Sequence, residues 1–96
     1  MMDNDIKQYN EMSECLKALA HPVRLCIIRG LLSKGHCNVT YMQECLGLPQ
    51  STVSQHLQKL RSMGIVETER HGLEVRYTVK DPRVKGLMEL FFQEDK

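Results

Sequence analysis

The segment LGLPQSTVSQHLQKLRSM, residues 46 to 63, constrains the fold more than any other stretch of the chain. It opens on Gly47 and Pro49, which favour a turn and a helix start. Val53, Leu57 and Leu60 then recur at the helical period and form one narrow apolar stripe. The other faces carry amides, hydroxyls and cations without an acidic residue. Such a helix is either solvated surface or a helix for the major groove of DNA, where amides and hydroxyls read base edges.

The stretch before this segment favours the second interpretation. Asn38 can cap a short helix that places Val39, Met42, Cys45 and Leu46 on one face. Two short helices joined around a glycine are typical of a helix-turn-helix, which we place at residues 38–63.

After Gly64 the apolar pattern changes from the helical period to period two. Residues 65–70 and 73–79 are predicted to be two strands, joined by a turn at His71-Gly72. Leu73 should lie on the apolar face of the second strand, with Val75, Tyr77 and Val79. A hairpin directly after a helix-turn-helix is a wing, here residues 65–79. Arg70 and Arg76 near its tip are either solvated or in contact with the DNA backbone.

Three further helices complete the predicted fold. Residues 22–34 are apolar over much of the helical circumference and should form the buried centre, while residues 5–20 and 81–93 each carry an apolar stripe. Packing of these two outer helices across a two-fold axis would bury both stripes, so we expect a homodimer. The fold class is therefore mainly α with a β-hairpin: one winged helix-turn-helix domain, residues 1–96, with five helices and a two-stranded wing that dimerises through its first and last helices.

Composition excludes several classes of protein. The net charge is only +1, but residues 59–85 hold seven basic residues against four acidic ones, a modest basic patch that suffices when two copies act together. No apolar run spans a membrane, and MMDNDIKQ is too acidic for a signal peptide, so we expect a cytoplasmic protein with four reduced cysteines. There is no Cys-x-x-Cys or Gly-rich phosphate loop, and we expect no enzyme.

The whole pattern resembles the ArsR/SmtB family of small bacterial transcriptional repressors. The resemblance runs from about Glu14 to Phe91, and its motifs are LAHPVRL, QSTVSQHL and the stretch from Leu60 to Val66, with a wing ending in Arg76-Tyr77. It implies a homodimer on double-stranded DNA that binds an inverted-repeat operator and is released by an inducer. MarR-type regulators are the nearest alternative, but they are longer. Pro49 departs from the family, which often has a capping serine there.

By that resemblance the recognition helix reads DNA with a defined set of side chains. The base-reading residues are Gln50, Ser51, Thr52, Ser54, Gln55 and His56, with Lys59 on the backbone. His56 either contacts DNA or is merely polar surface. Two alternatives remain: a winged-helix regulator that senses no small molecule, and a protein–protein interaction module. The acid-free face, which displays nothing apolar, argues against the module.

The inducer sites common in the family have no match here. Asn38-Val39-Thr40 replaces a Cys-x-Cys metal motif, and Arg29 replaces a cysteine of a redox pair. At the last helix Asp81 matches a metal ligand, but Arg83 occupies a histidine position and cannot ligate, and only Gln93, Glu94 and Asp95 stand at the other end. We therefore expect no interhelical zinc site there.

Four thiols remain as candidates for sensing. Cys26 and Cys45 are expected in the core, because free cysteine packs as a small hydrophobe. Cys37 lies in a polar loop beside His36, ahead of a helix start, where its pKa should be lowered. Our hypothesis is that Cys15 and Cys37 form a site for a soft metal, arsenite or an oxidant, with His36 or another cysteine as third ligand. The alternative is that the cysteines have no regulatory role.

Overall fold

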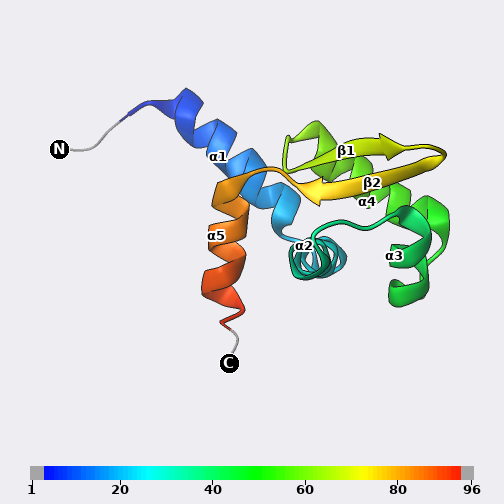
Figure 1. The fold of residues 1–96 in the computed structure, drawn as a ribbon. Helices are drawn as coiled ribbons and strands as arrows, with labels where there is room; N and C mark the ends of the chain where they lie inside the picture. Colours follow the sequence, from blue (N-terminus) through cyan, green and yellow to red (C-terminus); the bar gives the residue numbers. More distant parts are fainter. Residues whose placement is uncertain (1–3, 94–96) are drawn as a thin grey trace.

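A computed structural model describes residues 4–93 and has the predicted winged helix-turn-helix fold (Figure 1). Its elements, in chain order, are α1 (Ile6–Leu19), α2 (Pro22–Lys34), α3 (Val39–Leu46), α4 (Gln50–Ser62), β1 (Val66–His71), β2 (Glu74–Val79) and α5 (Pro82–Phe91). Within the described part of the chain, no helix is long and apolar enough to cross a membrane.

Side-chain caps explain where four of the helices begin. Asp5, Asn38 and Asp81 each accept a hydrogen bond from a backbone N–H in the first turn of the helix that follows. His21 does the same for α2, through Nδ1 and the N–H of Val23 at 3.1 Å. Pro49 stands at the cap of α4 in extended conformation and provides no side-chain hydrogen bond, so α4 begins without the cap that a serine would supply.

The wing is an antiparallel hairpin in which Val66 pairs with Val79 and His71 pairs with Glu74. The turn therefore lies at Gly72-Leu73, one residue later than predicted. Gly72 has φ +66°, which favours glycine. The prediction that Leu73 lies on the apolar face of the second strand was wrong: it sits in the turn, fully exposed.

The core lies where α2 and α4 meet the base of the wing. Side chains that are fully out of solvent include Ile28, Leu31, Val53, Leu57, Leu60 and Ile65 from these elements, and Val84 of α5 packs in the same core. The prediction that Cys26 and Cys45 are core residues was wrong, since both are exposed. Periodicity placed them near apolar neighbours, but within the described residues both side chains stay open to solvent, at the edges of a depression between α2 and α3.

Helices α1 and α5 lie together at the side of the molecule away from the tip of the wing (Figure 1). They share two apolar depressions, one of which is lined by Leu16, Leu19, Leu87 and Phe91. Several large apolar side chains on them are more than half exposed: Ile6, Leu16, Leu90 and Phe91. The stripe on each outer helix is therefore only partly covered within one chain.

Candidate nucleic-acid interface

Helix α4 is held against the protein by its apolar stripe. Val53, Leu57 and Leu60 are completely buried, and α4 packs against α3, α2 and β1. The residues between them consequently point outward or along the helix flanks: Gln50, Ser51, Gln55 and Lys59 are exposed, while Thr52, Ser54 and His56 are half-buried. The result is an outward face of hydroxyl, amide and ammonium groups, which can donate to and accept from base edges and phosphates.

The start of α4 has a second property that suits an anionic partner. Because Pro49 offers no side-chain acceptor, no side chain caps the first turn, in which the Thr52 N–H donates to the Pro49 carbonyl at 3.1 Å. A helix N-terminus of this kind carries positive partial charge and favours a phosphate oxygen. The exposed side chains of Gln50 and Ser51 stand at that same end.

His56 is tied into the protein on at least one side of its ring. Arg24 Nε donates to His56 Nδ1 at 3.1 Å, and the same guanidinium donates through Nη1 to the carbonyl of Ala18 at 3.1 Å. The rings of His21 and His56 lie 4.5 Å apart. Burial, followed by the nearby His21 and Arg24, lowers the pKa of His56 below its ordinary value. A neutral ring that accepts from Arg24 leaves only Nε2 to face a partner.

Arg24 is a residue that the sequence reasoning missed. It lies in the Ala-His-Pro-x-Arg-Leu motif, which was recognised but given no role. Its partner His56 is 32 positions away, so no local pattern links them. Through Ala18, Arg24 and His56 the end of α1 is connected to the middle of α4.

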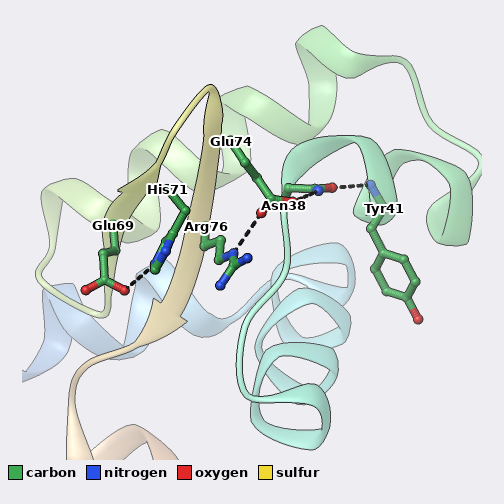
Figure 2. A network of polar contacts seen from close by, with 6 residues as sticks. All are labelled: Asn38, Tyr41, Glu69, His71, Glu74 and Arg76. Atoms are coloured by element: carbon green, nitrogen blue, oxygen red, sulfur yellow. Dashed lines mark hydrogen bonds and ion pairs between the residues drawn. The ribbon is translucent and has the colours of Figure 1, made fainter.

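The cationic side chains of the wing are largely paired with glutamates of the same strands (Figure 2). Arg76 Nε donates to Glu74 at 2.7 Å, and His71 Nε2 lies 2.7 Å from Glu69. These partners lower the pKa values of both carboxyl groups. Arg70 is exposed, and in the described part of the chain it contacts the carbonyl of Gly72, at 3.5 Å. Arg70 is thus the more available of the two predicted backbone contacts.

Figure 2 also shows that the wing is joined to the start of α3. Asn38 accepts from the Tyr41 N–H with its side-chain oxygen and donates from its nitrogen to Glu74. Glu74 in turn accepts from Arg76. One amide therefore caps α3 and holds the strand that carries Arg76.

The two cysteines of the predicted sensing site lie in different surroundings. Cys15 is half-buried on α1, beside the depression that Arg83 and Leu87 also line. Cys37 lies between α2 and α3, and its backbone exchanges hydrogen bonds with Tyr77 at 3.2 and 2.8 Å. Among the described residues, Cys15 and Cys37 line different depressions.

The expectation that the pKa of Cys37 is lowered was wrong. Its side chain is buried, because β2 lies against the loop that carries it. Burial is the largest effect and raises the pKa of the thiol, Lys34 opposes this, and Cys45 raises the pKa further. No group of three or more potential ligands among residues 4–93 is placed to hold a metal ion.

At α5, Arg83 binds the Asp81 carboxylate through Nε at 3.1 Å and Nη2 at 2.7 Å. Glu94 and Asp95 lie outside the described residues.

Comparisons with known proteins place this arrangement among transcriptional regulators. A helix-turn-helix domain model matches residues 19–69. The transcriptional repressor PagR of Bacillus anthracis is 45% identical over 81% of this chain and 78% of its own length. Its crystal structure superposes with a TM-score of 0.83 at 40% identity, covering 92% of this chain and all of that chain.

Two further relatives have the same character. The transcriptional repressor SmtB of Mycobacterium tuberculosis is 44% identical over 71% of this chain and 50% of its own length. A homodimeric winged helix-turn-helix DNA-binding domain from Mycobacterium bovis, described as a possible ArsR-family regulator, superposes with a TM-score of 0.82 at 30% identity. That comparison covers 95% of this chain and 83% of the domain.

Proposed function

Because this chain belongs to the ArsR/SmtB family of DNA-binding transcriptional repressors, we propose that it represses as a homodimer on an inverted-repeat operator. A thiol-reactive inducer releases it. The observation that carries the proposal is the acid-free outer face of α4, held outward by Val53, Leu57 and Leu60.

Base reading is assigned to the polar face of α4. Gln50, Ser51, Thr52, Ser54 and Gln55 meet base edges, and Lys59 meets a phosphate. His56 has a narrower role than its neighbours, because its Nδ1 already accepts from Arg24. Its Nε2 contacts DNA while the other edge of the ring positions the helix.

The dimer is supported by the exposed apolar side chains of α1 and α5. Ile6, Leu16 and Phe91 are 62%, 53% and 76% exposed in one chain, and a two-fold partner would cover them. The similar M. bovis domain is homodimeric. Two copies of α4 about 34 Å apart would then read two half-sites one turn of DNA apart.

The wing contributes contacts to the DNA backbone. Arg70 meets a phosphate directly, whereas Arg76 must exchange Glu74 for a phosphate. Both contacts add affinity without base preference.

Operator binding is tested by fluorescence anisotropy with DNA from the protein's own promoter. We expect a steep fall in affinity with salt. Gln55→Ala should relax base preference, whereas the matched variant Gln58→Ala, on the same helix but outside the proposed reading set, should not. Arg70→Ala should reduce the magnitude of the salt slope by about 1 and leave base preference unchanged. Wild-type binding that is weak, or indifferent to sequence, contradicts the proposal.

The inducer site predicted from the sequence, Cys15 with Cys37, would form between two subunits. Cys15 lies on an outer helix, and Cys37 ends the loop before α3. Binding of arsenite or Cd(II) would displace the thiol proton of Cys37, so the response should strengthen as pH rises. Operator affinity of Cys15→Ser and Cys37→Ser is measured with and without arsenite, Cd(II) and a disulfide oxidant. Unchanged induction in both variants rejects this pair.

A further inference from the structure

Three of the four cysteines line a single cavity between α2 and α3. The cavity has a volume of about 220 Å³, and its lining includes Cys26, Cys37 and Cys45. Ile27, Leu31 and Met42 provide apolar walls, and Lys34 and Tyr41 stand among its polar edges. Neither the base-reading face of α4 nor the Cys15–Cys37 pair accounts for this concentration of thiols.

The three thiols differ in access. Cys26 and Cys45 are exposed, whereas Cys37 is only 6% exposed. The charges of Lys34 and Cys45 both act on Cys37, so these three groups lie near one another around the cavity. Cys45 is therefore a solvent-accessible thiol on a cavity that is also lined by the Lys34 cation and the buried thiol of Cys37.

The ammonium group of Lys34 is held at the edge of the cavity by the aromatic ring of Tyr41. Lys34 Nζ lies 4.5 Å from the centroid of the Tyr41 ring, a cation–π contact that limits where the ammonium group can move. An ammonium group in this position can donate to an oxygen of a bound molecule. The apolar walls favour an uncharged carbon skeleton attached to that oxygen.

A single metal ion does not explain the cluster. In the chain from residue 4 to residue 93, no three potential ligands are arranged to hold one. The cavity is also below the roughly 300 Å³ of ordinary ligand pockets. The volume and the lining of the cavity therefore suit a small organic molecule better than a single metal ion.

We propose that the α2–α3 cavity binds a small, uncharged α,β-unsaturated carbonyl compound, which Cys45 captures covalently. The Cys45 thiolate forms a bond from Sγ to the β-carbon, and the π electrons of the double bond move toward the carbonyl oxygen. Lys34 stabilises the resulting enolate, and a proton is returned to the α-carbon from water. The reaction is an addition with no leaving group and no oxidant, and the thiol proton is balanced by the one returned.

The cavity lies where the adduct can act on the DNA-binding elements. The backbone of Cys37 is joined to Tyr77 of β2, and the next residue, Asn38, holds both α3 and Glu74. An adduct that spreads α2 and α3 must shift α3 relative to the wing or break these bonds. Either change alters the position of α4 and the wing on DNA, so the adduct should lower operator affinity.

The inference rests on the proposed operator binding, and the experiment separates the two. Wild-type dimer is treated with methyl vinyl ketone or, in parallel, with the charged alkylating agent iodoacetate. Adduct positions are read by peptide mass spectrometry and operator affinity by anisotropy. Failure of untreated protein to bind DNA contradicts the proposed function alone, because adduct formation is read independently.

We expect methyl vinyl ketone to modify Cys45 faster than Cys15 and to lower operator affinity by about tenfold. Iodoacetate should lose this preference for Cys45. Cys45→Ser should fold, because the side chain is exposed, and should keep its operator affinity under the ketone. Lys34→Met should slow addition at Cys45 roughly tenfold, whereas the matched exposed-lysine variant Lys80→Met should not. Equal labelling of Cys15 and Cys45, or unchanged affinity with Cys45 fully modified, overturns the proposal.

Discussion

The bond between Arg24 and His56 leads to a quantitative prediction for His56→Ala. The substitution removes the acceptor of Arg24 Nε and the ring that lies 4.5 Å from His21. A hydrogen bond from a charged donor contributes about 1.5–3 kcal/mol. The site is only half-buried, so water can partly replace the lost acceptor, and Arg24 keeps its bond to Ala18. We expect a loss of about 1.5 kcal/mol in the free energy of unfolding, or about 6–12 °C in Tm.

The conservative variant separates the hydrogen bond from the bulk of the ring. His56→Asn keeps an oxygen that can accept from Arg24, and asparagine and histidine have similar helix propensity. We therefore expect a loss below about 0.5 kcal/mol. Urea denaturation of the three proteins at one fixed protein concentration provides the comparison, because the proposed dimerisation would make the apparent stability depend on concentration.

The same bond predicts how stability changes with pH. The pKa of His56 is lowered in the folded protein from its ordinary value of 6.5, so the unfolded chain takes up this proton first as pH falls. The contribution of His56 to the free energy of unfolding is then fully present above pH 6.5, and it declines as the pH falls from 6.5 toward the folded pKa. His56→Asn lacks this group and should lose less stability between pH 7.5 and 5.5 than wild type. Equal losses in the two proteins, or equal destabilisation by Ala and Asn at pH 7.5, would refute this account of the contact.

Three other substitutions test separate features. Pro49→Ser supplies the missing cap of α4 and should stabilise the protein by about 0.5–1 kcal/mol in urea denaturation; no gain would mean that another group already serves the first turn. Asn38→Ala removes the cap of α3 and the bond to Glu74, and should cost about 1–2 kcal/mol by the same assay, whereas the exposed neighbour Thr40→Ala should change little. Phe91→Asp places a charge on a side chain that is 76% exposed in one chain and should shift sedimentation toward monomer, with Lys85→Asp as the control; an unchanged dimer would exclude this end of α5 from the interface.

Elements with local signals were predicted closely. Asn38 and Asp81 cap the helices that were expected to follow them, and α2 spans the predicted residues 22–34. The hairpin turn was misplaced by one residue, because His71-Gly72 and Gly72-Leu73 differ only in strand register. Register depends on pairing across the hairpin, where Val66 lies opposite Val79, rather than on either strand alone.

The cysteines show where local pattern stops being informative. Helical period assigned Cys26 and Cys45 to apolar faces, but a face is buried only where another element covers it. Conversely, Cys37 looked like an accessible loop residue, and it is buried because β2, forty residues later in the chain, pairs with its backbone. The exposure of the polar face of α4 could be predicted without knowing which elements pack together. Burial of the stripe of Val53, Leu57 and Leu60 against the protein turns the opposite face of the helix outward.

By itself, the sequence determined the order of elements, the cap at Asn38, the amphipathic pattern of α4 and the family, because these depend on neighbours within a few residues or on contiguous motifs. Tertiary structure alone decided that Arg24 ties His56 to the end of α1, that Asn38 links α3 to the wing, and that three thiols share one cavity. The physical reason is that burial, pKa shifts and long-range hydrogen bonds depend on which helices and strands pack against each other. Residues that are far apart in the sequence carry no local pattern that predicts this packing.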